Sequence, residues 1–146
     1  METVVGAPVE RVFDLARDID FHQRSMRHTG ERAVSGRTSG LIGPGETVTW
    51  RARQFGMSVS LTSRISEFEP LHRFVDEQVS GPFRRFRHEH RFERLGDEAT
   101  LMIDEWEHEA PLGLLGRVVD VVFLERYMRN LLQTRNAALK MEAERP

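Results

Sequence analysis

The stretch from Phe86 to Phe92 reads FRHEHRF and holds the residues of this chain best suited to chemistry. His88 and His90 lie two positions apart, so in a strand both imidazoles project from the same face. Such a pair can bind a metal ion, exchange protons with a ligand, or simply pack inside a sheet. Which of these applies depends on the face they occupy and on the acid that lies across from them.

Alternation along this stretch separates the histidines from the charged residues. The two phenylalanines share the histidine face, and the other face carries Arg85, Arg87, Glu89, Arg91 and Glu93. Burying five charges costs far more than burying two imidazoles, which can stay neutral. We therefore expect the histidines inside and the five charges on a solvated face. Because their signs alternate, they do not form the basic stripe that nucleic acid requires, and we expect no nucleic-acid partner.

The next strand-like segment offers two registers. A turn of two or four residues sets His90 opposite Ile103 and encloses both Glu105 and Glu107. A three-residue turn sets His90 opposite Asp104 and leaves this one acid inside. One buried acid beside histidines costs less than two acids without partners. We therefore expect the register with Asp104 inside.

That register gives the inner wall a mixed polar and apolar character. The wall then carries Phe86, His88, His90, Phe92, Met102, Asp104, Trp106 and His108. The orientation of segment 74–79 stays open, because Asp76 and Gln78 alternate with Val75 and Val79. Apolarity alone would turn the two valines inward.

The elements that hold this wall follow from periodicity. Apolar residues at helical spacing predict an amphipathic helix over about 8–17, and Asp18 or Asp20 can cap a second short helix that ends near Met26. From about residue 46 the period changes to two, and a run of antiparallel hairpins is expected up to residue 109.

The last expected element is a long C-terminal helix. It should begin at Pro111 and run to about Met141, with its apolar half, 118–124, buried deepest. We predict an α+β helix-grip fold in one domain, residues 1–146. A curved antiparallel sheet of six to seven strands and two short helices would enclose a cavity together with the long helix.

Composition excludes several classes of protein. Lys and Arg total 21 and Asp and Glu total 23, so the formal charge of −2 gives no reason to expect an anionic partner. The chain has no cysteine, which excludes disulfides and thiolate metal sites. It has no apolar run near the roughly 18 residues of a membrane span, and its N-terminus lacks a secretory signal. We expect a cytoplasmic protein without stable membrane insertion.

Three segments carry a resemblance to a known family: APVERVFDLARD at 7–18, FVDEQVSGPFRRFRHEHRFE at 74–93 and TLMIDEWEHEAPLGLLG at 100–116. Over nearly the whole chain they resemble the START-like, or SRPBCC, superfamily of helix-grip proteins, which includes the polyketide cyclase/dehydrase group. The resemblance implies an internal cavity for a small, mostly apolar ligand. It also implies pocket positions for Asp76, Gln78, His88, His90 and Asp104, and so favours an inward Asp76. The strand before Gly6 is shorter than this family usually has.

These observations predict binding of a small hydrophobic or amphipathic molecule between the long helix and the sheet. The candidate ligand-binding residues are Trp50, Asp76, Gln78, Phe86, His88, His90, Phe92, Met102, Asp104, Trp106 and Phe123. A lipid or quinone carrier is an alternative function. The pattern leaves the identity of the ligand and the oligomeric state open.

Catalysis of the cyclase/dehydratase kind is the leading alternative. His88 or His90, oriented by Asp104, could take a proton from the carbon beside a carbonyl group. The H-x-H pair with Asp104 or His108 could also hold Zn²⁺ or Fe²⁺. Because that ligand set is incomplete in the sequence, we expect no metal and no cofactor.

Overall fold

The computed structural model describes residues 1–54, 56–109 and 117–146, with the side chains of these residues except 54, 117–121 and 123. Its elements, in chain order, are β1 (Glu2–Val5), α1 (Val9–Ala16), α2 (Ile19–Ser25), the 3₁₀ helix η1 (Arg27–Thr29), β2 (Arg32–Gly36), β3 (Thr47–Gln54), β4 (Met57–Glu69), β5 (Arg73–Ser80), β6 (Arg85–Gly96), β7 (Ala99–Glu109) and α3 (Arg117–Ala143).

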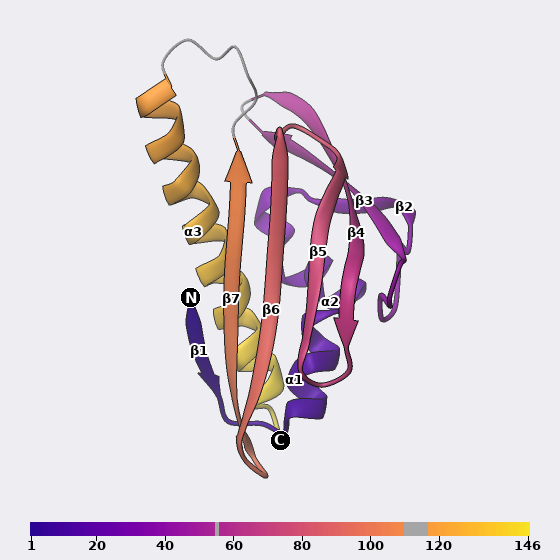
Figure 1. The fold of residues 1–146 in the computed structure, drawn as a ribbon, viewed down its shortest axis with the longest axis vertical. Helices are drawn as coiled ribbons and strands as arrows, with labels where there is room; N and C mark the ends of the chain where they lie inside the picture. Colours follow the sequence, from indigo (N-terminus) through magenta and orange to yellow (C-terminus); the bar gives the residue numbers. More distant parts are fainter. Residues whose placement is uncertain (55, 110–116) are drawn as a thin grey trace.

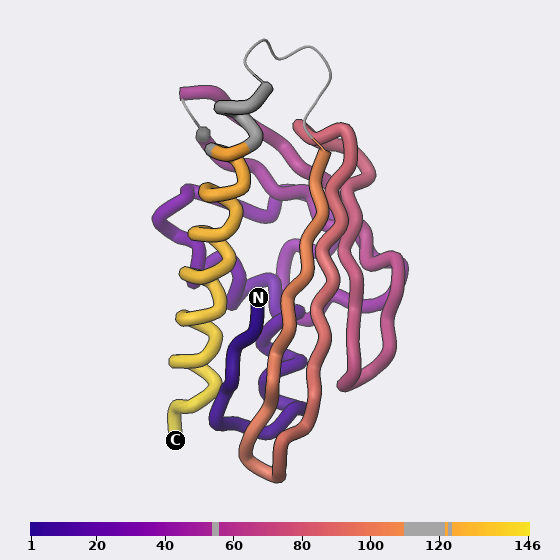
Figure 2. Tube along the Cα trace, turned by 60° about the vertical axis from the view of Figure 1, so that its left-hand side comes forward, coloured from indigo at the N-terminus to yellow at the C-terminus, as the bar shows by residue number. Residues whose placement is uncertain are grey.

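The strands form one antiparallel sheet of seven strands in the order β1-β7-β6-β5-β4-β3-β2. Figure 1 shows this sheet with all the helices on one of its faces. In Figure 2, α3 runs along one side of the molecule and the hairpins from β4 to β7 along the other. α3 packs against α1, α2 and β1. The structure thus has the predicted helix-grip fold. Within its described residues, no helix is long and apolar enough to span a membrane.

The two short helices form where the sequence predicts them. α1 buries Val9, Val12, Phe13 and Ala16, which recur at helical spacing. Asp18 caps α2, because its Oδ1 atom accepts hydrogen bonds from the backbone N–H groups of the second and third residues after it, at 2.8 and 3.1 Å. Phe13 contacts the rings of Phe68, Phe74 and Phe92 edge-on, and these four rings form the centre of the core below the cavity.

One strand was not predicted. β2 pairs with β3 at the edge of the sheet and precedes residue 46, where the predicted run of strands begins. Its side chains are exposed or half-buried, so no alternation of apolar residues marks it in the sequence. Gly36 ends it with φ +74°, and a Cβ atom there would lie 2.2 Å from the Thr47 carbonyl oxygen.

The long helix differs from its prediction in which half is buried. The expected start at Pro111 lies outside the described residues, and α3 ends at Ala143. In the apolar half, Val122 is 56% exposed, whereas the C-terminal half buries Leu132, Arg135, Asn136 and Leu139. The expectation of deepest burial is therefore wrong at Val122. The C-terminal half is buried because it packs against α1, where Arg135 donates to the carbonyl oxygen of Ala16.

The register of β6 against β7 is the predicted one. His90 lies opposite Asp104, and His88 lies opposite Trp106. The turn itself differs, because the chain reverses between Gly96 and Ala99 and the extra residue is taken up by an irregularity in β6 between residues 94 and 96. A β-bulge of this kind moves the register by one residue, as a longer turn would.

Candidate functional site

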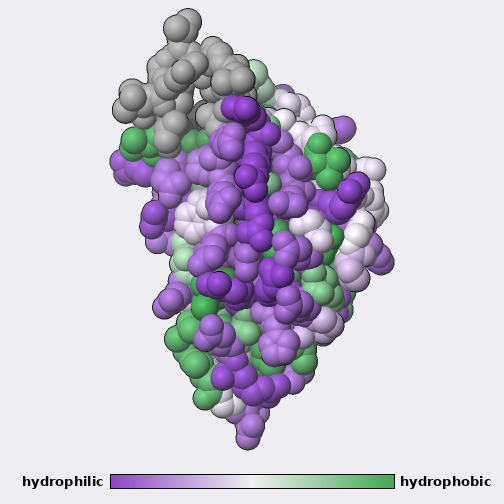
Figure 3. Space-filling model, viewed as in Figure 1, coloured by the Kyte–Doolittle hydropathy of each residue, from purple (hydrophilic) through white to green (hydrophobic). Residues whose placement is uncertain are grey.

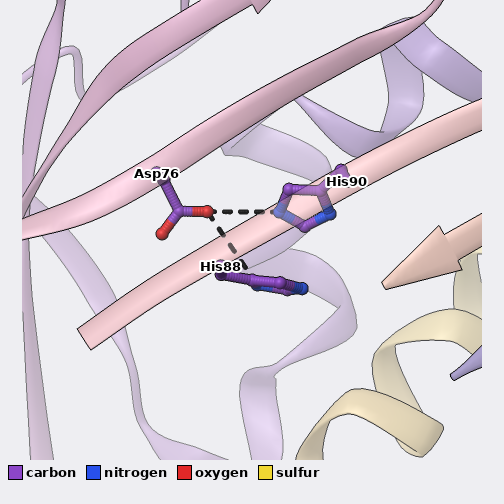
Figure 4. A group of neighbouring side chains, drawn as sticks. All are labelled: Asp76, His88 and His90. Atoms are coloured by element: carbon purple, nitrogen blue, oxygen red, sulfur yellow. Dashed lines mark hydrogen bonds and ion pairs between the residues drawn. The ribbon is translucent and has the colours of Figure 1, made fainter. Parts of the chain in front are cut away.

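Three neighbouring strands bring four titratable side chains together on the inner face of the sheet. Asp76 on β5 pairs with His88 on β6, and His90 on β6 pairs with Asp104 on β7. Figure 4 shows the carboxylate of Asp76 directed toward both imidazole rings. The inward Asp76 agrees with the family resemblance and contradicts the expectation from apolarity alone.

Asp104 is the fully buried centre of this cluster. Its Oδ1 atom lies 3.0 Å from Nε2 of His88 and 2.8 Å from Nδ1 of His90, and its own side chain has no exposed area. The second contact lacks the alignment of a hydrogen bond and is an ion-pair contact. The other oxygen, Oδ2, accepts a hydrogen bond of 2.6 Å from Nδ2 of Asn136. Both oxygens of a buried carboxylate are therefore engaged, as its burial requires.

Asp76 lies on the cavity side of the histidines and is 21% exposed. Its Oδ2 atom is 3.1 Å from Nε2 of His90 and 3.9 Å from Nδ1 of His88, so only His90 is within hydrogen-bond distance. The two imidazole rings lie 3.8 Å apart between their centroids. The cluster is thus a chain from Asp76 through His90 to Asp104, and His88 branches from Asp104.

The environment fixes the charge of the two acids. Burial alone would raise the pKa of Asp104, but the hydrogen bond and charges of His88 and His90 outweigh burial and hold this pKa well below its usual range. Burial opposes ionisation of Asp76 in the same way, and its hydrogen bond to His90 still leaves the Asp76 pKa lowered. Both acids are therefore carboxylates at neutral pH, and they can only accept hydrogen bonds.

The same environment shifts the pKa values of the two histidines in opposite directions. Burial would lower the pKa of His90, but the carboxylates of Asp104 and Asp76 on either side of the ring raise it overall. Burial lowers the pKa of His88, and the charge of His90 lowers it further. His88 therefore stays neutral, with a proton on Nε2 for Asp104 and a lone pair on Nδ1.

Helix α3 supplies two partners that the sequence analysis missed. Arg135 donates from Nη2 to the carbonyl oxygen of Ala16, at 2.8 Å, and its Nη1 atom lies 3.7 Å from Oδ1 of Asp104. Asn136 follows it and bonds to the same acid. A signal existed in the sequence: between Leu132 and Leu139, helical spacing requires an inward residue near 135. The positive charge of Arg135 lies near the carboxylates of the cluster, and their charges raise the pKa of His90 between them.

A cavity of about 890 Å³, its open mouth included, adjoins this cluster. It lies between α3, the short helices and the inner face of the sheet. Its lining is mostly apolar and includes Ile19, Met26, Ile42, Val48, Trp50, Leu61, Ile65, Phe74, Phe86, Met128, Leu131 and Leu132. The polar residues in the lining include Asp76, His88, His90 and Arg135 at the cluster, and His22 and Glu31 elsewhere.

The candidate residues from the sequence fall into two groups. Five of them line the cavity: Trp50, Asp76, Phe86, His88 and His90. The other described candidates do not line it. Asp104 lies behind the histidines, and Phe92 and Met102 pack in the core. The Gln78 amide bonds to the backbone of Phe83, and Trp106 lies beside the Arg129 guanidinium. The side chain of Phe123 lies outside the described residues.

Three of these residues also have a geometry that could hold a metal ion. Asp76, His88 and His90 each offer one ligand atom, and the three atoms lie within 4.8 Å of one another. Asp104 stands behind both rings, which is where a carboxylate commonly orients histidine ligands of a metal. The hydrogen bond between His90 and Asp76 shows that a proton also satisfies this arrangement. The expectation that the protein needs no metal stays a prediction.

Comparisons with known proteins agree with the helix-grip fold. The family model described as polyketide cyclase / dehydrase and lipid transport matches residues 5–133. The Zhui aromatase/cyclase from Streptomyces sp. R1128 superposes with a TM-score of 0.76 and 20% identity, covering 99% of this chain and 92% of that one.

Two further structures are similar in fold. A START superfamily protein from Mycobacterium smegmatis gives a TM-score of 0.71 at 16% identity, covering 99% of this chain and 94% of its own. The protein TTHA0849 from Thermus thermophilus gives 0.75 at 18% identity, covering 98% and 94%. No curated protein matches the chain.

Proposed function

Since the chain belongs to the polyketide cyclase/dehydrase and lipid transport family, we propose that it binds a small amphipathic molecule in the cavity described above. The apolar part of the ligand packs against the lining between α3 and the sheet. Its polar end is a hydroxyl group, or an enol, that donates a hydrogen bond to Asp76 or His88.

One observation carries this proposal: a buried cluster of acids and histidines forms one end of a cavity whose other walls are mostly apolar. A few convergent polar groups in an apolar pocket are typical of small-molecule sites. At this end, the cavity offers the carboxylate of Asp76 and the lone pair on Nδ1 of His88, and both are acceptors. Acceptors of this kind favour a ligand that donates a proton.

Tryptophan fluorescence can test the proposal. The chain has two tryptophans, and Trp106→Phe leaves Trp50, which lines the cavity, as the single reporter. We expect 2-naphthol to quench Trp50 and to bind more tightly than naphthalene, because only 2-naphthol has a hydroxyl group. Native mass spectrometry of the purified protein, followed by denaturation, would show whether a molecule of the same kind is already bound.

Asp76→Asn, made in the Trp106→Phe background, tests the polar end. The substitution keeps the shape of the side chain and removes its charge, and we expect affinity for 2-naphthol to fall roughly tenfold or more. Affinity for naphthalene should stay the same. Glu105→Gln on the outer face is the matched control and should leave both affinities unchanged. If Asp76→Asn binds 2-naphthol as tightly as the parent does, Asp76 is not the acceptor, and an unchanged affinity in His88→Phe as well would show that the proposed polar end is wrong.

A second candidate function is acid–base catalysis, and the geometry of His88 favours it specifically. Asp104 accepts the Nε2 proton of His88 at 3.0 Å, which leaves Nδ1 as the basic atom. This atom can take a proton from the carbon beside a carbonyl group, which gives an enolate and an imidazolium that Asp104 stabilises. Deuterium exchange at the α-carbon of 1-tetralone, followed by NMR in D₂O, measures that step.

We expect the protein to accelerate this exchange and His88→Phe to reduce the acceleration at least roughly a hundredfold. His108→Phe is the control, because His108 lies on the neighbouring strand and does not line the cavity. Exchange at the same rate in His88→Phe would exclude His88 as the base. In that case the binding proposal would stand without catalysis.

A further inference from the structure

A second polar pair lines the cavity away from the buried cluster. Nε2 of His22, on α2, lies 3.1 Å from Oε2 of Glu31, which follows η1. The ring of His22 packs on the indole of Trp50, with 4.3 Å between the ring centroids and 34° between their planes. All three residues are part of the cavity lining. The pair is therefore a feature of the pocket as well as of the surface.

Local structure holds this pair in place. The 3₁₀ helix η1 ends at Gly30, whose φ of +68° is the left-handed conformation that glycine adopts without strain. The next backbone N–H, that of Glu31, donates to Oγ1 of Thr29 at 3.2 Å. On the other side, the side chain of Gln23 accepts a hydrogen bond from Ala33, which ties α2 to β2. These contacts fix the segments on either side of Glu31.

The pair has spare hydrogen-bonding capacity. Glu31 engages Nε2 of His22, but Nδ1 makes no hydrogen bond to any residue in the described ranges 1–54, 56–109 and 117–146. The side chains of His22 and Glu31 are 25% and 21% exposed, and Trp50 below them is buried. If Glu31 is ionised it accepts the Nε2 proton, so Nδ1 of a neutral His22 is an acceptor. A ligand in the cavity can use this atom.

The two polar regions lie well apart. His88 is on β6 and Asp76 is on β5, whereas Trp50 is on β3, so two to three strand spacings, roughly 10–14 Å along the sheet, separate the cluster from Trp50. The lining on the intervening strands is largely apolar, with Leu61 and Ile65 on β4 and Phe74 on β5. Ser63 on β4 is a polar residue of this intervening lining, so the cavity is polar at two ends and largely apolar between them.

We propose that His22 and Glu31 form a second polar anchor, and that the ligand is an elongated, largely apolar molecule with a hydroxyl group at each end. One hydroxyl donates to Asp76 or His88, as in the proposed function on which this inference rests. The other donates to Nδ1 of His22 or to the carboxylate of Glu31. Trp50 packs beside the part of the ligand next to this second hydroxyl.

Pairs of ligands that differ by one hydroxyl group test this anchor. The probes are 4-hydroxybiphenyl with 4,4′-dihydroxybiphenyl, and 4-hydroxystilbene with 4,4′-dihydroxystilbene, which differ in length. Equilibrium dialysis gives their dissociation constants without relying on Trp50 fluorescence. In the unmodified protein, we expect the second hydroxyl to tighten binding roughly tenfold in at least one pair.

His22→Phe should abolish this gain and leave the affinity for the monohydroxy probe within about twofold of the unmodified protein. Glu31→Gln, which keeps the shape of the side chain, should reduce the gain and serves as the second variant if His22→Phe does not fold. His28→Phe is the matched control, because His28 is exposed on η1 and does not line this cavity. It should keep the whole gain.

The outcomes separate the two proposals. Equal affinities for mono- and dihydroxy probes in both pairs would overturn the second anchor, as would a gain that survives in His22→Phe. Both results would leave the single-ended binding proposal intact. If none of the four probes binds, the proposed function itself fails, and the second anchor fails with it.

Discussion

The outer face of β6 carries five charged side chains and the inner face carries two histidines, and the surroundings of the two sets differ completely. On the outer face, Arg87 and Glu89 take part in a network of ion pairs with β4 and β5. Figure 3 shows the hydrophilic surface that runs down this face of the sheet. On the inner face, His88 and His90 meet two carboxylates in a space closed by α3.

Outer pairs contribute little to stability. Arg73, for example, contacts Glu67 and Glu69, but these acids are 44% and 57% exposed, and water and salt screen each pair. The expected solvated face is present at its two ends, where Arg85 and Glu93 are exposed, whereas the side chains of Arg87 and Glu89 between them are 21% and 13% exposed. Removing one residue from it leaves the partner free to turn to water.

The charged interactions on the inner face, in contrast, have large effects on stability. Water cannot replace a lost partner of Asp104, because the side chain has no exposed area. A single substitution therefore leaves a buried charge uncompensated, which costs far more than the pair contributes as a whole. The same types of residue thus have small effects on one face of the strand and large effects on the other, and burial alone makes the difference.

Asp104→Asn should have the largest effect on stability. It removes the charge that His90 and Arg135 face and keeps the volume of the side chain. We expect a loss of about 3–5 kcal/mol in the free energy of unfolding. Urea denaturation followed by circular dichroism measures it. A loss below about 1 kcal/mol would mean that the cluster carries no net charge interaction.

Acid should destabilise the protein through the same inner cluster. The folded-state pKa values of Asp104 and Asp76 are lowered, so their contribution to stability is complete above the ordinary aspartate pKa of about 3.9 and is lost as the pH falls through the folded values. We expect urea midpoints to decline steeply below about pH 4. In Asp104→Asn this decline should be much shallower. An equal decline in both proteins would assign it to the outer acids.

The histidines add smaller dependences of stability on pH, and the one from His90 is opposite in sign to that of the acids. The pKa of His90 is raised, so its contribution to stability is complete below the ordinary histidine pKa of about 6.5 and is lost as the pH rises through the folded value. The pKa of His88 is lowered, so its contribution is complete above about 6.5 and is lost as the pH falls. NMR titration of the two rings should show His90 deprotonating at higher pH than His88. If His88 deprotonated at a higher pH than His90, Nδ1 of His88 would be excluded as the base of the site.

The sequence predicts the inner wall better than the residues that cover it. Alternation and the cost of a second buried acid were enough to place His88, His90 and Asp104, because a strand fixes its side chains by parity. Arg135 could not be placed in this way, since its contact with Asp104 depends on how α3 packs against the sheet.

The orientation of β5 and the contact between His22 and Glu31 could not be predicted from the local sequence pattern. Val75 and Val79 suggested that their side of β5 faces inward, yet Val75 is buried on the outer side and Val79 is exposed. His22 is on α2 and Glu31 follows η1, and the sequence alone does not show that these two side chains meet. In both cases the deciding interaction is tertiary: the alternation in β5 indicated the wrong face, and no periodic pattern links His22 with Glu31.

Glu105→Gln should have the smallest effect, although Glu105 is the immediate neighbour of Asp104. It lies on the outer face, where Arg91 donates to its Oε1 atom at 2.8 Å, and the two side chains are 58% and 41% exposed. We expect a loss of less than about 1 kcal/mol that disappears in 1 M NaCl, whereas the effect of Asp104→Asn should persist in salt. Urea denaturation at low and high salt compares the two. If Glu105→Gln costs as much as Asp104→Asn, the outer network fixes the pairing of β6 with β7, and burial is not what separates the two faces.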